Sequence, residues 1–389
     1  MAFSQFKRVA VKGISVVLPP REICIYDEAQ YYGNNVKKID RMRKMVGFWK
    51  RRVVDENTTP ADMAIDAAKK LLDGTHTDKN TIDALVFVTQ SPDYPTPASA
   101  FSIHNALGLP DSCSAFDINL GCPGWVYGMQ LAHSMIESGA NRRVLLLAGD
   151  SPSTKVEISD RINAPLFGDA AAATLLEYSD TPLETPTYFD LGADGSGYDA
   201  IITPAGGARL PLKFDAEHDA AYNAPVLEPI AAKGGHTTNL TQKQMNGMKV
   251  FNFTMTVVPK KIRAFMQKIG ITESDIDSLV LHQANKQIVE TVCQQAGFPL
   301  EKTSFKTFEE FGNQTVTSIP AALCHTLKEK MTSPEGVKVL YSGFGIGLAW
   351  GSCATTFKNL SYAEINTFEL TEDRKTRSDY VNYWRDYIS

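Results

Sequence analysis

Continuous apolar runs alternate along the chain with stretches in which apolar residues recur at helical spacing. The first pattern predicts strands and the second predicts helices. Continuous apolar runs at 83–90 (DALVFVTQ) and 143–149 (RVLLLAG) are typical of strands buried on both faces of a parallel sheet. Between them, apolar residues recur at helical spacing, as in 59–72, where Thr59 stands at a capping position and Pro60 at the first helical one. Strand–loop–helix order predicts an α/β protein.

The same plan runs through both halves of the chain. In the first half we expect strands at 7–18, 83–90, 114–120 and 143–149, a small-residue turn and a further strand within 165–178, and helices at 37–45, 59–72, 98–107 and 123–139. In the second half we expect a helix at 251–269 broken at Pro259, helices at 286–296 and 319–330, and strands at 277–281, 337–343 and just before 357.

These elements suggest four segments. Residues 1–180 form a first half, and residues 249–357 a second, similar half. Residues 181–248 are rich in Gly, Pro and Ala, and we expect loops over the functional site there. Residues 358–389 are a polar tail with six aromatic side chains, which we expect to be ordered, either on the body or across a dimer.

Composition narrows the class of protein. The chain has 389 residues, 43% hydrophobic and 21% charged, which is ordinary for a globular protein. It shows no apolar run of membrane-spanning length and no signal-peptide core, so we expect a cytoplasmic protein away from membranes. Six scattered cysteines, without CxxC pairs, predict free thiols and no metal site.

Charge is unevenly distributed. The net charge is −5, yet 37–52 holds eight basic residues against Asp40 alone. A basic patch on an acidic protein indicates either an anionic partner or merely a solvated helix face. Nucleic acid is disfavoured as the partner because no binding motif accompanies the patch.

The stretch 117–130 (DINLGCPGWVYGMQ) carries the strongest chemical signal. A short strand runs into Gly121-Cys122-Pro123-Gly124, and a helical pattern follows. This turn places the Cys122 sulfur at a helix N-terminus, where the free N–H groups and the dipole should lower the thiol pKa. The competing interpretation is a buried structural cysteine.

Six motifs in order extend this signal over residues 7–357. They are DINLGCPG around Cys122, DRINAPLFGDAAAA at 160–173, MNGMKVF at 245–251, LVLHQAN at 279–285, FGNQTVTS at 311–318 and FGIGLAWGS at 344–352. With them the sequence resembles β-ketoacyl-acyl carrier protein synthase III of the thiolase-fold superfamily. The resemblance implies a five-layered αβαβα thiolase fold from two similar halves, and a homodimer.

The resemblance also implies a mechanism without a cofactor. Cys122 would take an acyl group from a thioester, and a malonyl thioester would then lose carbon dioxide. His282 and Asn313 would stabilise the resulting enolate, and the backbone N–H groups of Cys122 and Ile346 would form an oxyanion hole. The family usually has glycine at the position of Ile346, so this change should reshape the acyl channel.

Substrate-binding positions follow the family only in part. Arg161 matches the arginine on the adenine side of CoA, and Phe344 and Asn285 lie within matching motifs. Thr96 stands where the family places a phenylalanine that closes the primer pocket of the partner subunit. The tryptophan and the two further arginines that hold CoA are replaced by Arg41, Met45 and Gln287.

These departures favour acyl carrier protein over CoA as the carrier of both acyl and malonyl groups. The expected docking patch comprises Arg41, Lys44, Arg51, Arg52, Lys260, Lys261 and Arg263. The implied function is decarboxylative Claisen condensation in a fatty-acid or a specialised acyl or polyketide pathway. The alternative is a related acyltransferase that moves the acyl group to an alcohol or amine without decarboxylation. A non-enzymatic binding role would form no acyl-Cys122.

Overall fold

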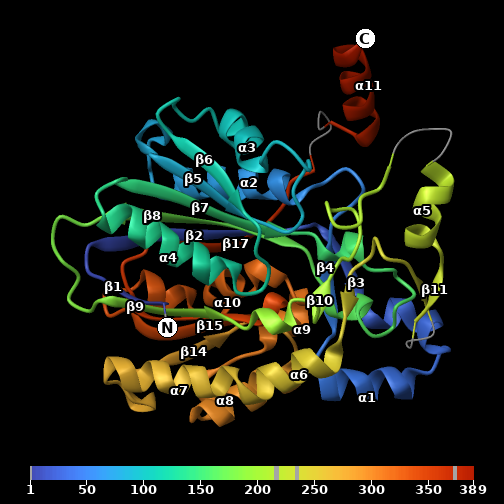
Figure 1. The fold of residues 1–389 in the computed structure, drawn as a ribbon. Coiled ribbons are helices and arrows are strands. Elements are labelled where there is room, and N and C mark those ends of the chain that lie inside the picture. The colour runs from blue at the N-terminus through green and yellow to red at the C-terminus, as the bar shows by residue number, and fades with distance from the viewer. Residues whose placement is uncertain (1, 214–218, 233–235, 371–374) are drawn as a thin grey trace.

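The computed structural model describes residues 2–213, 219–232, 236–370 and 375–389. Among the described residues, two large β-sheets of six and five strands alternate with layers of helices to give five layers, and three further sheets have two strands each (Figure 1). Helices α4 (Gly124–Glu137) and α10 (Ser318–Thr332) lie between the sheets, α2 (Pro60–Gly74) and α3 (Ser99–Leu107) cover the first sheet, and α7 (Val258–Ile269) and α8 (Lys286–Ala296) cover the second. This is the five-layered thiolase architecture expected from the sequence.

The first sheet has the strand order β17-β2-β8-β7-β5-β6. Its strands are β2 (Val9–Leu18), β5 (Ala84–Val88), β6 (Ser114–Ile118), β7 (Arg143–Asp150), β8 (Ala170–Tyr178) and β17 (Tyr362–Thr367). Strand β5 pairs in parallel with β6 and β7, and every residue of β5 is buried because helices cover both faces of the sheet. Strand β6 forms an edge of this sheet.

The second sheet has the order β1-β9-β16-β15-β14. Its strands are β1 (Ala2–Phe6), β9 (Thr187–Ala193), β14 (Ser278–Leu281), β15 (Val337–Gly345) and β16 (Ala349–Phe357). Strands β14 and β15 are parallel and the other neighbours are antiparallel. The two halves therefore repeat one plan, with β9-β16-β15-β14 in the second sheet matching β2-β8-β7-β5 in the first.

Local sequence signals explain where several helices begin and end. Thr59 caps α2 in a box with Asp62, and Pro60 is the first residue of that helix, as predicted. The helical pattern at 251–269 is divided into α6 (Gly247–Thr256) and α7, with Pro259 in the first turn of α7. Helix α1 (Val36–Val46) ends at Gly47, whose φ of 93° suits glycine.

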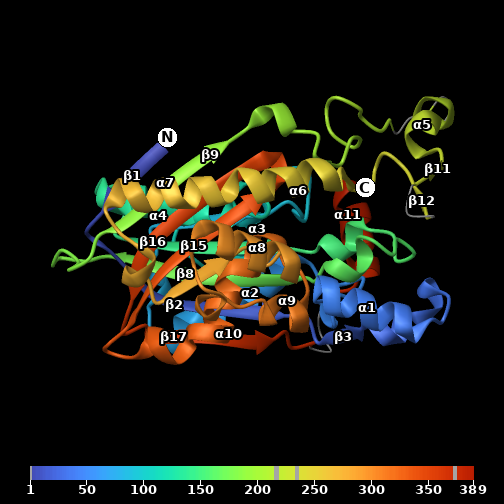
Figure 2. The same cartoon turned by 90° about the horizontal axis from the view of Figure 1, so that it is seen from below.

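The prediction that 181–248 consists of loops is wrong for β9. Seven residues of this range lie in the interior of the second sheet, between β1 and β16. The remainder holds α5 (Asp219–Leu227) and the short strands β10 (Ile201–Ile202), β11 (Ile230–Ala231), β12 (Thr237–Thr238) and β13 (Gln244–Met245). Figure 2 shows α5, β11 and β12 grouped at one end of the molecule.

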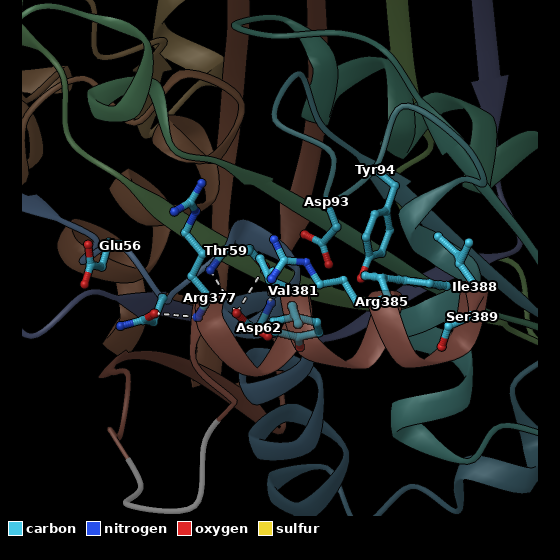
Figure 3. Close-up of a pocket in the computed structure, with 13 residues that line it drawn as sticks. Glu56, Thr59, Asp62, Asp93, Tyr94, Arg377, Val381, Arg385, Ile388 and Ser389 are labelled. Atoms are coloured by element: carbon cyan, nitrogen blue, oxygen red, sulfur yellow. Dashed lines mark hydrogen bonds between the residues drawn. The ribbon is translucent and has the colours of Figure 1, made fainter. Parts of the chain in front are cut away.

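The tail has two parts with different packing. Strand β17 joins the first sheet beside β2, with Ala363 buried, whereas α11 (Arg377–Ile388) has no buried residue. A cavity of about 710 Å³ separates α11 from the body, where Tyr94 makes an edge contact with Trp384 and the Arg377 N–H donates to Asn57 (Figure 3). Residues 371–374 lie outside the described residues. In the described part of the chain, no helix has the length and apolar character needed to cross a membrane.

Candidate active site

Cys122 lies in a turn between β6 and α4 that two close backbone approaches fix. The N-cap of α4 is Pro123, so the thiol precedes the helix N-terminus as predicted. Across the turn, a side chain at Gly345 would place its Cβ 2.9 Å from Sγ of Cys122. A Cβ at Gly343 would come within 2.8 Å of Pro123 Cα. Only glycine at these positions lets the end of β15 lie against the cysteine turn.

Two backbone N–H groups approach the sulfur of Cys122. They belong to Ile346 and to Cys122 itself, and both lower the thiol pKa through hydrogen bonding. Burial is the larger effect, however, and raises the pKa of the Cys122 thiol above its ordinary value. The expectation of a lowered pKa is therefore wrong, because the loss of water around the thiolate destabilises it more than the two N–H groups stabilise it.

His282 follows the last residue of β14, and its backbone N–H donates to the backbone carbonyl of Ser342 at 2.9 Å. The ring is buried, and Nδ1 lies 2.6 Å from the Ser318 hydroxyl. Burial lowers the pKa of His282 to about 3, so the imidazole is neutral at physiological pH. Phe344 stands edge-on to this ring, with 5.8 Å between the ring centroids.

Backbone bonds orient the Asn313 amide. Its Oδ1 accepts the N–H of Thr315 at 2.9 Å, so the carbonyl end of the side chain is held within the turn. Its backbone N–H donates to Leu166 O at 2.7 Å, and its backbone O accepts from Gly168 at 3.1 Å. This arrangement leaves the side-chain NH₂ as the group that Asn313 can offer to a ligand.

A buried carboxylate supports that turn. Thr315 has a φ of 48°, a strained conformation for a β-branched residue. Its hydroxyl donates to Asp150 Oδ2 at 2.5 Å, and Asp150 Oδ1 accepts the Gln90 N–H at 2.7 Å. Burial raises the pKa of Asp150 above its ordinary value. This network joins the turn that carries Asn313 to β7.

Cys122, His282 and Asn313 line one cavity of about 200 Å³. They are up to 191 positions apart in the sequence, and the fold brings them together from the turn before α4, the end of β14 and the turn after α9 (Lys306–Phe311). Apolar side chains supply most of the remaining wall: Leu166, Phe167, Ile201, Met245, Val250, Phe251, Ile288 and Ile346. Such a cavity can hold an acyl chain beside a nucleophile and two neutral hydrogen-bond donors.

The other predicted substrate residues divide into two pairs. Phe344 and Asn285 line the cavity, although the Asn285 side chain also caps α8 by accepting the Ile288 N–H at 2.8 Å. Arg161 and Thr96 are not among the described residues that line it. Thr96 is exposed in the loop before α3, and half-buried Arg161 accepts a weak bond from Tyr32 through its backbone carbonyl.

The predicted basic patch needs one correction. Arg51 is only 4% exposed, and its guanidinium forms a bidentate ion pair with Glu28 at 2.6 and 2.8 Å. It therefore supports β4 (Lys50–Val53) internally and offers no surface charge to a partner. The Arg52 guanidinium lies 3.4 Å from the Glu22 carboxylate of β3 (Arg21–Cys24), so part of its charge is already paired and less is left for a partner protein.

The remaining basic residues form two groups on one side of the molecule. Arg41 and Lys44 are exposed on α1, and Lys260 and Arg263 are exposed on α7. Lys261 is half-buried, with its ammonium 4.7 Å from the Trp350 ring centroid. Figure 2 shows α1 and α7 at opposite ends of the same face, with α6 between them.

Sequence reasoning missed three residues that shape the site. Ser318 is the last residue of the FGNQTVTS motif, so the motif itself pointed to this partner of His282. Asp150 ends the apolar run of β7, where a buried carboxylate is unexpected and therefore informative. Lys243 lies in the range treated as loops, and no motif marked it before the structure placed it on the cavity wall.

Comparisons with known proteins follow the same division of the chain. The family models "3-Oxoacyl-[acyl-carrier-protein (ACP)] synthase III" and its "C terminal" counterpart match residues 116–195 and 266–357. A curated Campylobacter jejuni protein called "Putative 3-oxoacyl-[acyl-carrier-protein] synthase 3" is 34% identical over 358 residues, covering 92% of this chain and 96% of its own. A β-ketoacyl-[acyl-carrier-protein] synthase III of Symbiobacterium thermophilum is 31% identical, covering 90% and 98%.

Comparison with solved structures points to the same family as the sequence comparisons. The 3-oxoacyl-(acyl-carrier protein) synthase of Burkholderia xenovorans superimposes with a TM-score of 0.83 at 31% identity, covering 94% of this chain and 99% of its own. The fold of this chain is that of thiolase-fold condensing enzymes. Within that class, the chain belongs to the 3-oxoacyl-[acyl-carrier-protein] synthase III family, the β-ketoacyl synthases III.

Proposed function

We propose that this enzyme condenses an acyl thioester primer with malonyl-acyl carrier protein, with loss of carbon dioxide, through an acyl group on Cys122. The observation that carries the proposal is the single cavity in which the Cys122 thiol meets His282 and Asn313. The names of the relatives, which are synthases of 3-oxoacyl groups on acyl carrier protein, support the same reaction.

In the first half-reaction the Cys122 sulfur attacks the primer carbonyl. The N–H groups of Cys122 and Ile346, which already approach the sulfur, would donate to the carbonyl oxygen as it becomes negative. The carrier leaves as a thiol and takes the proton that the Cys122 thiol gives up. Because Ile346 acts through its backbone, its side chain is free to narrow the channel for the acyl group.

In the second half-reaction a malonyl thioester places its carbonyl oxygen between His282 Nε2 and the Asn313 NH₂. Cleavage of the carboxyl carbon bond releases carbon dioxide, and its electron pair becomes the enolate that these two donors stabilise. The enolate carbon then attacks the acyl carbonyl on Cys122. A new carbon–carbon bond forms, the thiolate of Cys122 leaves, and a β-ketoacyl thioester results.

The proposed partner for both substrates is acyl carrier protein, with CoA as the second carrier to be tested. The exposed cations Arg41, Lys44, Lys260 and Arg263 suit a small acidic protein. We also propose a homodimer, because β6 is a sheet edge with half-exposed Phe116 and Ile118 that a second copy can cover. We further propose a cytoplasmic location for the reaction.

Mass spectrometry of the intact protein after incubation with primer thioesters tests the proposal. We expect an added acyl mass on Cys122, no added mass in Cys122→Ala, and retained acylation but slow carbon dioxide release in His282→Ala and Asn313→Ala. The primer that acylates Cys122 also distinguishes a fatty-acid from a specialised pathway. Normal turnover of Cys122→Ala would contradict the assignment, and acyl transfer to an alcohol or amine without carbon dioxide release would favour the alternative acyltransferase.

A further inference from the structure

One charged side chain in the Cys122 cavity has no place in the reaction described so far. Lys243 immediately precedes β13 and lines both this cavity and a neighbouring one of about 460 Å³. Its ammonium lies 5.4 Å from the ring centroid of Phe167, whose backbone pairs with Asn313. Lys243 therefore stands on the same wall as the Asn313 donor.

Within the described part of the chain, the ammonium of Lys243 has no anionic partner. Among the described residues, none forms an ion pair or a side-chain hydrogen bond with it. Its charge nevertheless acts on Cys122 and on Asp150, lowering the pKa of both groups. Lys243 is half-buried, and an ammonium in such a partly desolvated position can form a charge-assisted hydrogen bond with an anionic ligand.

The lining of the cavity shows what that ligand must carry. The described residues of the wall include no Asp, Glu or Arg, and Lys243 is their only permanent cation. Because its field reaches the Cys122 sulfur, the complementary anion belongs near the reacting carbonyl. That position corresponds to the acyl group of a thioester bound at Cys122.

We propose that Lys243 forms a subsite for a carboxylate carried by the acyl group of a substrate thioester. The proposal rests on the proposed condensation, in which two substrates can bring such a carboxylate. One is the malonyl donor, whose carboxylate is attached to the carbon next to the thioester. The other is a primer with a carboxylate at the far end of its acyl chain. Both present the same chemistry to the ammonium.

Two assays distinguish these sources, each on wild type and on Lys243→Met. The first compares acylation of Cys122 by glutaryl and by valeryl thioesters, which share a five-carbon chain and differ in the terminal carboxylate. The second measures KM for the malonyl thioester with a neutral primer. Using the glutaryl-to-valeryl ratio cancels any change in Cys122 thiolate that the lost charge causes. The matched control is Lys155→Met, since exposed Lys155 accepts the Lys243 N–H through its backbone carbonyl and lines only the neighbouring cavity.

We expect Lys243→Met to lower the glutaryl-to-valeryl ratio, or to raise KM for the malonyl thioester, by about tenfold or more. The first result identifies a primer subsite and the second a donor subsite. Unchanged values in both assays, or equal changes in Lys155→Met, would overturn the proposal while valeryl acylation still supported the condensation itself. Failure of wild type to acylate Cys122 with any primer would instead refute the proposed function.

Discussion

The Ser318 hydroxyl lies 2.6 Å from Nδ1 of His282, a distance at which either the hydroxyl donates to Nδ1 or a protonated Nδ1 donates to the hydroxyl. The same hydroxyl has Thr315 O within 3.0 Å as a second acceptor. When Ser318 donates to Nδ1, the neutral ring carries its proton on Nε2 and can donate to a thioester oxygen. We therefore predict that Ser318 donates to Nδ1 in the active enzyme, since only this arrangement offers an Nε2–H to the thioester.

Ser318→Ala should therefore slow release of carbon dioxide from a malonyl thioester by about tenfold, because the tautomer is no longer fixed. Acylation of Cys122, which does not use His282, should stay near the wild-type rate. Ser352→Ala is the control, since Ser352 is equally buried but bonds to Ser342. Equal decarboxylation rates in Ser318→Ala and wild type would show that the hydroxyl does not select the tautomer.

The pH dependence of decarboxylation should lack a histidine step near neutrality. Burial lowers the pKa of His282 to about 3, so the imidazole stays neutral at every pH above that value and becomes charged only in stronger acid. We expect a flat rate between about pH 5 and 8. The measurement uses Cys122→Ala, which removes titration of the thiol. A fall in rate below a midpoint near 6.5 would mean that His282 keeps the pKa of an exposed imidazole.

Gly345→Ala should block Cys122, because the added Cβ would lie 2.9 Å from Sγ. We expect acyl-Cys122 formation to fall by more than about tenfold, with a loss of stability of about 1–3 kcal/mol. Gly347→Ala is a matched control: its φ of 71° also favours glycine, but its Cβ would meet no atom within 4 Å. It should cost about 1 kcal/mol of stability and leave acylation largely intact. Similar acylation rates in the two variants would contradict a steric role for position 345.

Reversing charges on α1 should weaken use of the carrier protein. The double variant Arg41→Glu, Lys44→Glu should raise KM for acyl carrier protein thioesters about tenfold at low salt and less at high salt. KM for the matching CoA thioester should change little, and Lys330→Glu, an exposed lysine on α10, should leave both values unchanged. Unaltered KM with the carrier protein would show that these cations are only solvated surface.

The two parts of the tail should differ in their effect on stability. Removing 376–389 deletes α11, which has no buried residue, and should shift the melting temperature by no more than about 2 °C. Removing 359–389 also deletes β17, with buried Leu360 and Ala363, and should lower it much further. Differential scanning calorimetry of both truncations compares the two. Equal shifts would mean that α11, despite its exposure, supplies the stabilisation.

Most of the helices and strands followed from periodicity and capping because those signals are local. Thr59 with Pro60, and Pro259 between α6 and α7, mark element ends in the chain itself. Strand β9 was missed because its run TYFDLGA lies in a segment whose Gly and Pro content favours loops, while its partners β1 and β16 are remote in sequence.

The candidate site was predictable only where motifs named residues. Cys122, His282 and Asn313 were identified from motifs, and the structure gathers them in one cavity. The burial of Arg51 against Glu28 depends on a contact across 23 positions, which charge counting along 37–52 does not reveal. The rise in the Cys122 pKa likewise depends on how much protein surrounds the sulfur, a property of packing and not of the turn alone.

The placement of the terminal strands has a consequence for synthesis of the protein. Strand β1 precedes every strand of the first sheet along the chain but belongs to the second sheet, and β17 follows every strand of the second sheet but completes the first. Neither sheet can therefore be finished from its own half of a growing chain. During translation the outer edge of β2 stays unpaired until β17 is made. Strand β1 likewise stays unpaired until β9, some 180 residues later, is made. The two halves are interlocked at both ends, so they should not behave as separable units when expressed as fragments.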